Sequence, residues 1–234
     1  MTQSTSMKRS AEIASGRAAL YNLFIGVFEQ PPDHNLLAKI RGGEFELLLA
    51  GHRELGEKGF RAGLDKISSY RFAILKRPDE QVLTDLAVDR TRILRGTGQS
   101  DMKPPYEGLY KKGVGFGESV RDVRRFYRKA GLVPDDTVTE AADYLCVELD
   151  FMKQLCLRER TLYLREGESE QLIAQSIALE EEFLRMHLGA WIGAFCSAVV
   201  KHASTDFYRG FALILDAYIR IEKAYVIDTH PERL

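Results

Sequence analysis

The acidic side chains of residues 140–155 are the first candidates for chemistry in this sequence. If this run is helical, five apolar side chains share one face: Leu145, Leu149, Met152, Leu155 and Cys156. Glu148 falls on the same face, whereas Asp143 and Asp150 point away from it. A carboxylate on a buried face costs free energy unless it is paired or hydrogen-bonded. Glu148 is therefore either a structural acid near the start of a helix or a group that receives a cation.

The same run resembles a motif of the TorD/DmsD/NarJ family, cytoplasmic chaperones for molybdenum- or tungsten-containing oxidoreductases. That motif reads EPxDHxxxELEFM, and six residues match it: Glu140, Asp143, Glu148, Leu149, Phe151 and Met152. Three residues depart from it, since Ala141 replaces a proline, Tyr144 a histidine and Asp150 a glutamate. The resemblance therefore supports the family's fold more firmly than the roles of its site residues.

Residues 86–96 resemble the end of a second helix of the same family, whose sequence reads EYxRLFxG. Arg92 and Gly96 match it, and Arg90 stands where the family has tyrosine. Because Arg90 falls on the apolar face of this predicted helix, its guanidinium should reach solvent or pair with a buried acid. Glu148 is one candidate for that acid. The alternative is that Arg90 lies at a domain rim without a specific partner.

A loop over residues 103–110 is similar to the family segment PPYESVY. Its Pro104 and Pro105 fix the backbone φ angle and stiffen the loop. Tyr106 and Tyr110 offer the amphipathic contact surface that interfaces favour, and Glu107 is the acid of the motif.

The last matching segment, residues 183–191, resembles the family's HLxxW helix through His187 and Trp191. A lone histidine on an apolar face is either a satisfied core residue or a ligand, and the core role is the commoner one. We expect Trp191, the only tryptophan, to lie in the core with one edge at a groove.

The resemblance implies a chaperone that binds the N-terminal leader, often a twin-arginine leader, of an apo-oxidoreductase catalytic subunit and delays export until its cofactor is inserted. Such a leader has a basic region followed by an apolar one. A receptor then needs carboxylates beside an apolar groove, and Asp143 and Glu148 would meet the arginines. The implied peptide-binding set is Asp143, Tyr144, Glu148, Tyr106, Glu107, Tyr110, Arg92, Phe151, His187 and Trp191.

We expect a cleft between two domains, lined by Tyr106, Asp143, Tyr144 and Trp191. Two alternatives remain open at this point. One is a small-molecule site in this cleft, with weak affinity for GTP or molybdopterin guanine dinucleotide. The other is a NarJ-type assembly factor whose client is not exported. Further partners implied by the resemblance are the twin-arginine translocation and cofactor-insertion machineries. We expect no enzyme activity and no metal, because no cysteine or histidine spacing matches a structural or catalytic site.

Helices must position all of these residues. The apolar spacing predicts an all-α bundle of about ten helices, at residues 13–28, 33–41, 44–49, 60–76, 78–95, 118–130, 139–166, 168–203 with room for one break, and 206–226. We expect Asp33 and Asp206 to cap helices, and residues 96–117 to form a long loop. Gly131 and Pro134 predict a hinge over residues 131–142 between a domain of residues 1–130 and another of residues 143–234.

Composition limits the class of protein. The 234 residues carry a formal net charge of −1, which argues against a nucleic-acid partner. No apolar stretch is long enough to span a bilayer, and the three cysteines form no CxxC pair. An odd cysteine count fits a reducing compartment, so we expect a cytoplasmic protein. A flexible hinge would permit either a monomer or a domain-swapped dimer.

Overall fold

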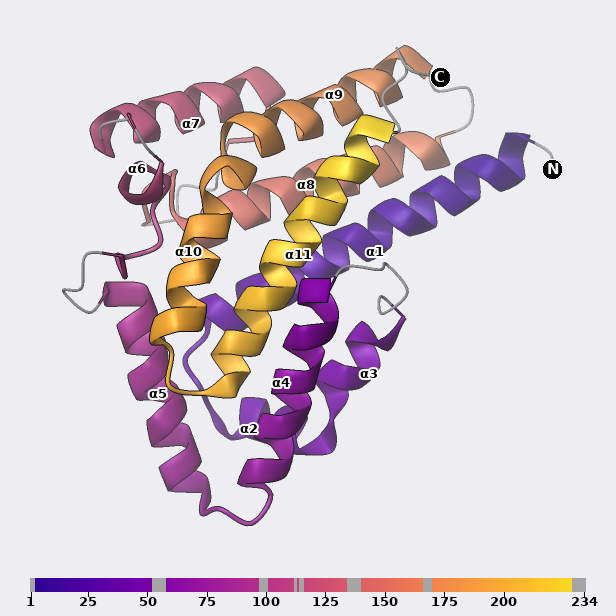
Figure 1. Cartoon of the computed structure of the whole chain (residues 1–234). Coiled ribbons are helices and arrows are strands. Elements are labelled where there is room, and N and C mark those ends of the chain that lie inside the picture. Colours follow the sequence, from indigo (N-terminus) through magenta and orange to yellow (C-terminus); the bar gives the residue numbers. More distant parts are fainter. Residues whose placement is uncertain are drawn as a thin grey trace. The chain divides into compact units, whose positions relative to one another are not determined.

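The computed structural model describes residues 3–51, 58–96, 101–111, 113, 116–133, 140–165 and 170–228. Within these residues the chain forms eleven helices: α1 (Gln3–Glu29), α2 (His34–Gly42), α3 (Glu44–Ala50), α4 (Lys58–Ile74), α5 (Asp79–Arg95), α6 (Glu107–Tyr110), α7 (Phe116–Ala130), α8 (Leu145–Leu164), α9 (Glu170–Met186), α10 (Leu188–His202) and α11 (Asp206–Asp228) (Figure 1). The same ranges contain no strand, only an isolated antiparallel bridge between Tyr106 and Tyr144. The all-α prediction is confirmed.

Local sequence signals set most of the helix ends. Asp33 caps α2 as predicted, because its carboxylate accepts the Leu36 N–H at 2.7 Å. Gly43 separates α2 from α3 with a φ of 74°, a left-handed conformation that glycine adopts without strain. Pro78 precedes the first residue of α5, and Gly96 follows its last.

One predicted helix start and one predicted helix cap were wrong. The helix that carries Glu148 begins at Leu145 and not at residue 139, so Asp143 lies in the turn before it. Asp206 is the first residue of α11 and does not cap it, because Thr205 precedes the helix and its Oγ accepts the Tyr208 N–H at 3.5 Å. The carboxylate of Asp89 in turn accepts the N–H groups of Ser204 and Thr205, each at 2.8 Å. In the predicted loop over residues 96–117, one helical turn (α6) forms, and α7 begins at Phe116.

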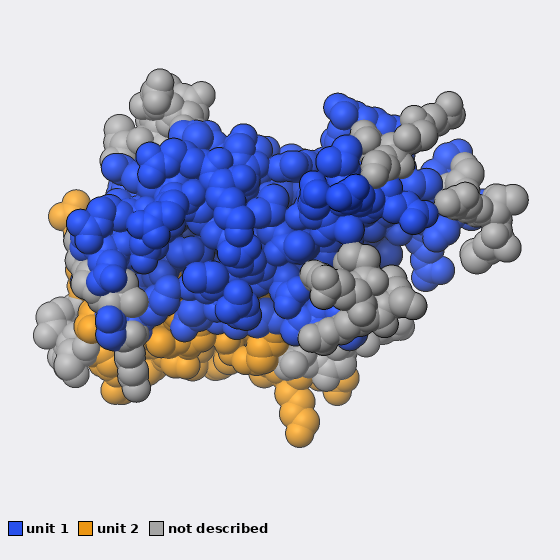
Figure 2. Space-filling view, turned by 90° about the horizontal axis from the view of Figure 1, so that it is seen from above, with its two compact units in different colours: residues 1–28, 106–190, 222–234 blue, residues 29–105, 191–221 orange. Residues whose placement is uncertain are grey.

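The chain divides into two compact units that are discontinuous in sequence (Figure 2). Unit 1 comprises residues 1–28, 106–190 and 222–234, and unit 2 comprises residues 29–105 and 191–221. These units do not test the division predicted from sequence, into residues 1–130 and 143–234, so that division stays a prediction. Of its hinge over residues 131–142, residues 134–139 lie outside the described residues.

Each unit has an aromatic core. In unit 1, the rings of Tyr127 and Phe151 lie 4.4 Å apart and those of Phe151 and Phe183 4.6 Å apart, which joins α7, α8 and α9. In unit 2, α4 and α11 cross at Gly63 and Gly210. A Cβ atom on Gly63 would lie 2.6 Å from the Gly210 carbonyl oxygen, so the crossing requires glycine.

The length and hydropathy of the helices in the described residues bear on whether they could cross a membrane. No single helix there is long and apolar enough to cross a membrane, although α9 and α10, bent at their junction, satisfy the length and composition criteria as a pair.

Candidate functional site

Eight of the ten predicted site residues lie in unit 1: Tyr106, Glu107, Tyr110, Asp143, Tyr144, Glu148, Phe151 and His187. They come from the segment around α6, the turn before α8, α8 itself and the end of α9. The remaining two, Arg92 and Trp191, lie in unit 2. The predicted cleft that joins Trp191 to Tyr106, Asp143 and Tyr144 therefore stays a prediction.

Asp143 fastens the α6 segment to the turn before α8. Its backbone carbonyl accepts the Glu107 N–H at 2.9 Å, and its Oδ2 accepts the Gly108 N–H at 3.2 Å. The side chain is fully buried. Burial raises the pKa of Asp143, against the opposing effects of the Gly108 N–H and the nearby Ser119 hydroxyl. Among the described residues, neither Asp143 Oδ1 nor Ser119 Oγ has a hydrogen-bond partner of acceptable geometry.

Two tyrosines and a glutamate lie next to Asp143. The Tyr106 and Tyr144 rings are 5.3 Å apart, and the Tyr106 hydroxyl donates to Glu140 Oε2 at 3.0 Å. Burial, with the neighbouring Glu140 carboxylate, raises the pKa of Tyr106 to about 12, so its hydroxyl stays protonated and can donate. Glu140 is exposed. An accessible carboxylate therefore lies beside the buried one.

Glu107 is the centre of an ionic cluster that fixes α6. Its Oε2 lies 3.0 Å from His187 Nδ1, and its Oε1 accepts from Lys111 Nζ at 2.7 Å. Burial raises the pKa of Glu107, but the hydrogen bonds from His187 and Lys111 outweigh it and hold the pKa below its ordinary value. Lys111 also donates to the Met186 carbonyl at 2.5 Å. Glu107 therefore acts as a structural anchor between α6 and the end of α9.

The other predicted residues of unit 1 are mainly structural in this conformation. His187 is buried against Phe126 and Phe183, at ring distances of 5.5 and 5.1 Å, as expected for a satisfied core histidine. Glu148 is fully buried in the first turn of α8, on the apolar face where the spacing placed it. Phe151 belongs to the aromatic core, and Tyr110 is half-buried.

In unit 2, Arg92 and Trp191 also have structural contacts. Arg92 lies 3.1 Å from Asp89 and hydrogen-bonds to Ser204, next to the start of α11. Trp191 is buried, with its ring 6.1 Å from that of Phe195. Arg90, for which Glu148 was a predicted partner, donates instead to the backbone carbonyl of Glu29.

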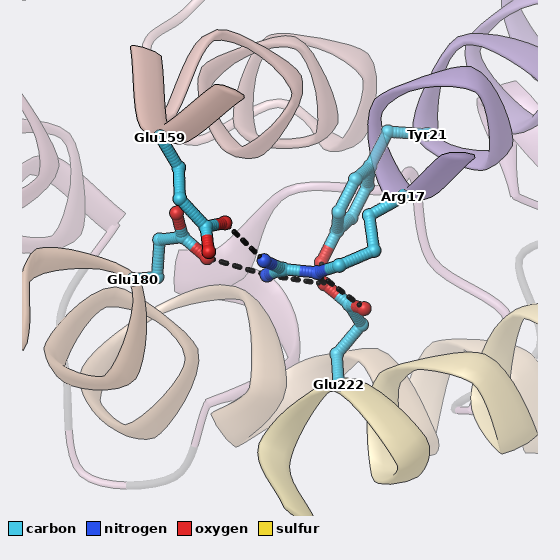
Figure 3. Close-up of polar contacts among 5 residues, drawn as sticks. All are labelled: Arg17, Tyr21, Glu159, Glu180 and Glu222. Carbon is cyan, nitrogen blue, oxygen red and sulfur yellow. Dashed lines mark hydrogen bonds and ion pairs between the residues drawn. The ribbon is translucent and has the colours of Figure 1, made fainter. Parts of the chain in front are cut away.

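The interpretation of the sequence missed a buried charge cluster around Arg17 in unit 1, the largest among the described residues (Figure 3). The guanidinium lies 2.5 Å from Glu159 and 2.9 Å from Glu222, and it also pairs with Glu180. The Tyr21 hydroxyl donates to Glu222 at 3.1 Å. All three carboxylates are at most 2% exposed, and they come from α8, α9 and α11.

One signal could have revealed this cluster. Glu159 follows Met152, Leu155 and Cys156 at helical spacing, as Glu148 follows Leu145. A charged residue on the apolar face of a helix indicates a buried partner elsewhere in the chain. In the structure that partner is Arg17. Among the described residues, no group of three or more histidine, cysteine, aspartate or glutamate side chains could hold a metal ion.

Comparison with known proteins supports the resemblance seen in the motifs. Residues 55–197 match the family described as nitrate reductase delta subunit. The chain is 24% identical to the chaperone protein TorD of Vibrio parahaemolyticus, over 90% of this chain and 94% of that protein. It is 25% identical to the chaperone protein TorD of Shewanella pealeana, over 90% and 89% of the two chains, and 23% identical to that of Vibrio atlanticus, over 94% and 99%.

Proposed function

Because this chain belongs to the nitrate reductase delta subunit family, we propose that it is a system-specific chaperone for the maturation of a molybdenum- or tungsten-containing oxidoreductase. Support comes from relatives that are named chaperones and that align with this chain over most of both lengths. The protein is accordingly a binding protein and not an enzyme.

We further propose that the chaperone binds the leader peptide of its client at Asp143, with Glu140 and Tyr106 beside it. The observation that carries this proposal is the buried Asp143 carboxylate, whose Oδ1 accepts no hydrogen bond of acceptable geometry among the described residues, although the nearby Ser119 hydroxyl lowers its pKa. Burying a carboxylate oxygen without a hydrogen bond costs free energy, and a donor that binds it removes this cost. A leader arginine supplies several donors in a planar fork, and it could bind Asp143 Oδ1 once the Tyr106 side chain moves aside while α6 stays anchored.

The aromatic rings of Tyr106 and Tyr144 would then contact the apolar part of the leader. Glu107, His187 and Lys111 hold α6 in place, so they would position the site without touching the peptide. The predicted residues of unit 1 thus have two different roles, contact with the peptide and positioning of α6, and substitutions can separate them.

The experiment begins with the client. Affinity purification from the native host, followed by mass spectrometry, would identify the co-purifying oxidoreductase and its leader. Calorimetric titration of the full chain with that leader should then show binding that Asp143→Asn weakens by about 1–3 kcal/mol, the cost of losing a hydrogen bond to a charged group. Asp150→Asn, on a half-exposed residue of α8 paired with Lys153, is the matched control and should bind like the parent.

Parent-like binding by Asp143→Asn, with an unchanged melting temperature, would show that this carboxylate does not receive arginines. A client without a leader would favour the NarJ-type alternative, in which the chaperone assembles an enzyme that is not exported. Tight binding of GTP with no affinity for the leader would favour the small-molecule alternative.

A further inference from the structure

Helix α7 (Phe116–Ala130) has one apolar and one strongly basic face. Its buried side chains are Val123, Phe126, Tyr127 and Ala130, and the rings of Phe126 and Tyr127 pack against Phe183 of α9 and Phe151 of α8. Figure 1 shows α7 beside these helices within unit 1. Its exposed side chains include five cations: Arg121, Arg124, Arg125, Arg128 and Lys129. Because the apolar face of α7 is buried in unit 1, its basic face is exposed to solvent.

Three of these cations pair with no acid among the residues that the structure describes. Arg125 lies 3.5 Å from Asp122, and Lys129 pairs with Glu182 of α9. Arg121, Arg124 and Arg128 make no ion pair or side-chain hydrogen bond with any residue that the structure describes. We call these three residues the arginine row.

Arg121 and Arg124 of the arginine row do not serve the stability of α7. Arg121 and Arg124 are three residues apart, and Arg124 and Arg128 are four apart, so each pair places like charges side by side and destabilises the helix. The helix dipole favours cations only in the last turn, which Arg121 and Arg124 do not reach. In a chain of net charge −1, such a row needs another explanation.

The chemistry of the arginine row indicates its ligand. Three guanidiniums over two helical turns cover about 10 Å, and each presents a planar fork that matches a carboxylate. No large apolar side chain is exposed among the described side chains of α7, so it lacks the apolar face with which a helix enters a lipid surface. The near-neutral chain also lacks the basic surplus of a nucleic-acid binder.

We propose that the arginine row docks an acidic segment of a partner protein, whose carboxylates pair with Arg121, Arg124 and Arg128. This inference goes beyond the proposed leader site, because that site would receive arginines and this one receives carboxylates. The two surfaces would therefore bind segments of opposite charge independently.

The test uses the full chain and fluorescence anisotropy with labelled poly-L-glutamate at physiological salt. The double variant Arg121→Glu/Arg124→Glu should bind at least about tenfold more weakly than the parent. The matched control is Arg61→Glu/Arg160→Glu, which makes the same change in net charge at two exposed arginines outside α7. The control should lose less than about threefold, because only long-range attraction is reduced.

A second variant separates geometry from charge. Arg121→Lys/Arg124→Lys keeps both charges but removes the planar fork, so it should bind with an intermediate affinity. Leader binding should be unchanged in every α7 variant, which distinguishes failure here from failure of the leader site.

Three results would overturn the proposal: no binding of poly-L-glutamate by the parent, equal losses in the α7 and control variants, or binding to phosphatidylserine vesicles that exceeds binding to the peptide and depends on Arg121 and Arg124. Circular dichroism spectra and melting temperatures should match between parent and variants, which shows that a loss of binding is not a loss of folding.

Discussion

Arg17 is a single guanidinium that faces three buried carboxylates in unit 1. Arg17 and Tyr21 come from α1, and the carboxylates belong to Glu159, Glu180 and Glu222. If all three were ionised, the cluster would carry a net charge of −2 in an environment of low polarity. Burial, together with the neighbouring carboxylates of Glu159 and Glu222, raises the pKa of Glu180 to about 8 against the opposing effect of Arg17. The cluster therefore holds a proton at neutral pH.

This proton makes stability depend on pH. Because the pKa of Glu180 is raised from 4.5 to about 8 by folding, the folded state binds the proton more tightly than the unfolded state. The stabilisation is complete below pH 4.5 and is lost as the pH rises through about 8. We expect the free energy of unfolding in urea to fall across this window.

Glu180→Gln should flatten that dependence, so that the variant gains stability relative to the parent as the pH rises. Among the described residues, the charged and titratable groups that face Glu180 are Arg17, Glu159, Glu222, Cys156, Tyr163 and Tyr225. Glu12→Gln, on the exposed face of α1, is the control and should keep the slope of the parent. An unchanged slope in Glu180→Gln would assign the proton to another group.

At the scale of elements, buried acids join helices that are distant in sequence. Asp89 of α5 is fully buried and accepts hydrogen bonds from Ser204 N, Thr205 N and Thr205 Oγ, at 2.7 to 2.8 Å. It thus fixes Thr205, the residue before α11, whose Oγ accepts the Tyr208 N–H at 3.5 Å in the manner of a capping residue. Asp206, in contrast, forms partly exposed ion pairs with Lys66 and Arg209, each at 3.1 Å.

The two aspartates should therefore differ in their effect on stability. Asp89→Ala should lower the free energy of unfolding by about 2–3 kcal/mol, because it leaves buried N–H groups without an acceptor. Asp206→Ala should cost only about 0–1 kcal/mol, as expected for exposed ion pairs. Urea denaturation of both variants would decide, and a larger cost at Asp206 would restore it as the residue that stabilises the start of α11.

At the scale of the whole molecule, each unit is assembled from separate stretches of the chain. Unit 1 needs α1, the segment from α6 to α9, and the end of α11. Its ionic cluster joins residues 142, 163 and 205 positions apart. A folding unit of this kind does not correspond to a continuous half of the chain.

This organisation predicts the behaviour of a fragment. Residues 143–234 contain Glu159, Glu180 and Glu222 but lack Arg17, and they also lack Phe126 and Tyr127 of α7. Because uncompensated buried charges are strongly destabilising, we expect this fragment not to unfold cooperatively on its own. Thermal melts followed by circular dichroism would test this. A cooperative melt would instead support the sequential division at residues 131–142.

Local signals were sufficient to predict the helical class, most helix ends and the family. Asp33, Gly43 and Pro78 act on their immediate neighbours, so their effects are independent of the rest of the fold. The apolar spacing likewise placed Glu148 on the buried face of α8. The start of α8 was harder to predict from the sequence, because Asp143 is held before the helix by contacts with the α6 segment. These contacts come from the fold and not from adjacent residues.

The amino-acid sequence by itself determined which side chains must be buried and which family the chain resembles, because periodicity and motifs are local properties. Only the tertiary structure decided which buried charges meet. Glu107 meets His187 across 80 positions, and Arg17 meets Glu222 across 205. A buried carboxylate shows from its spacing that it needs a donor, but the identity of that donor depends on which helices converge, and this is a property of the whole fold.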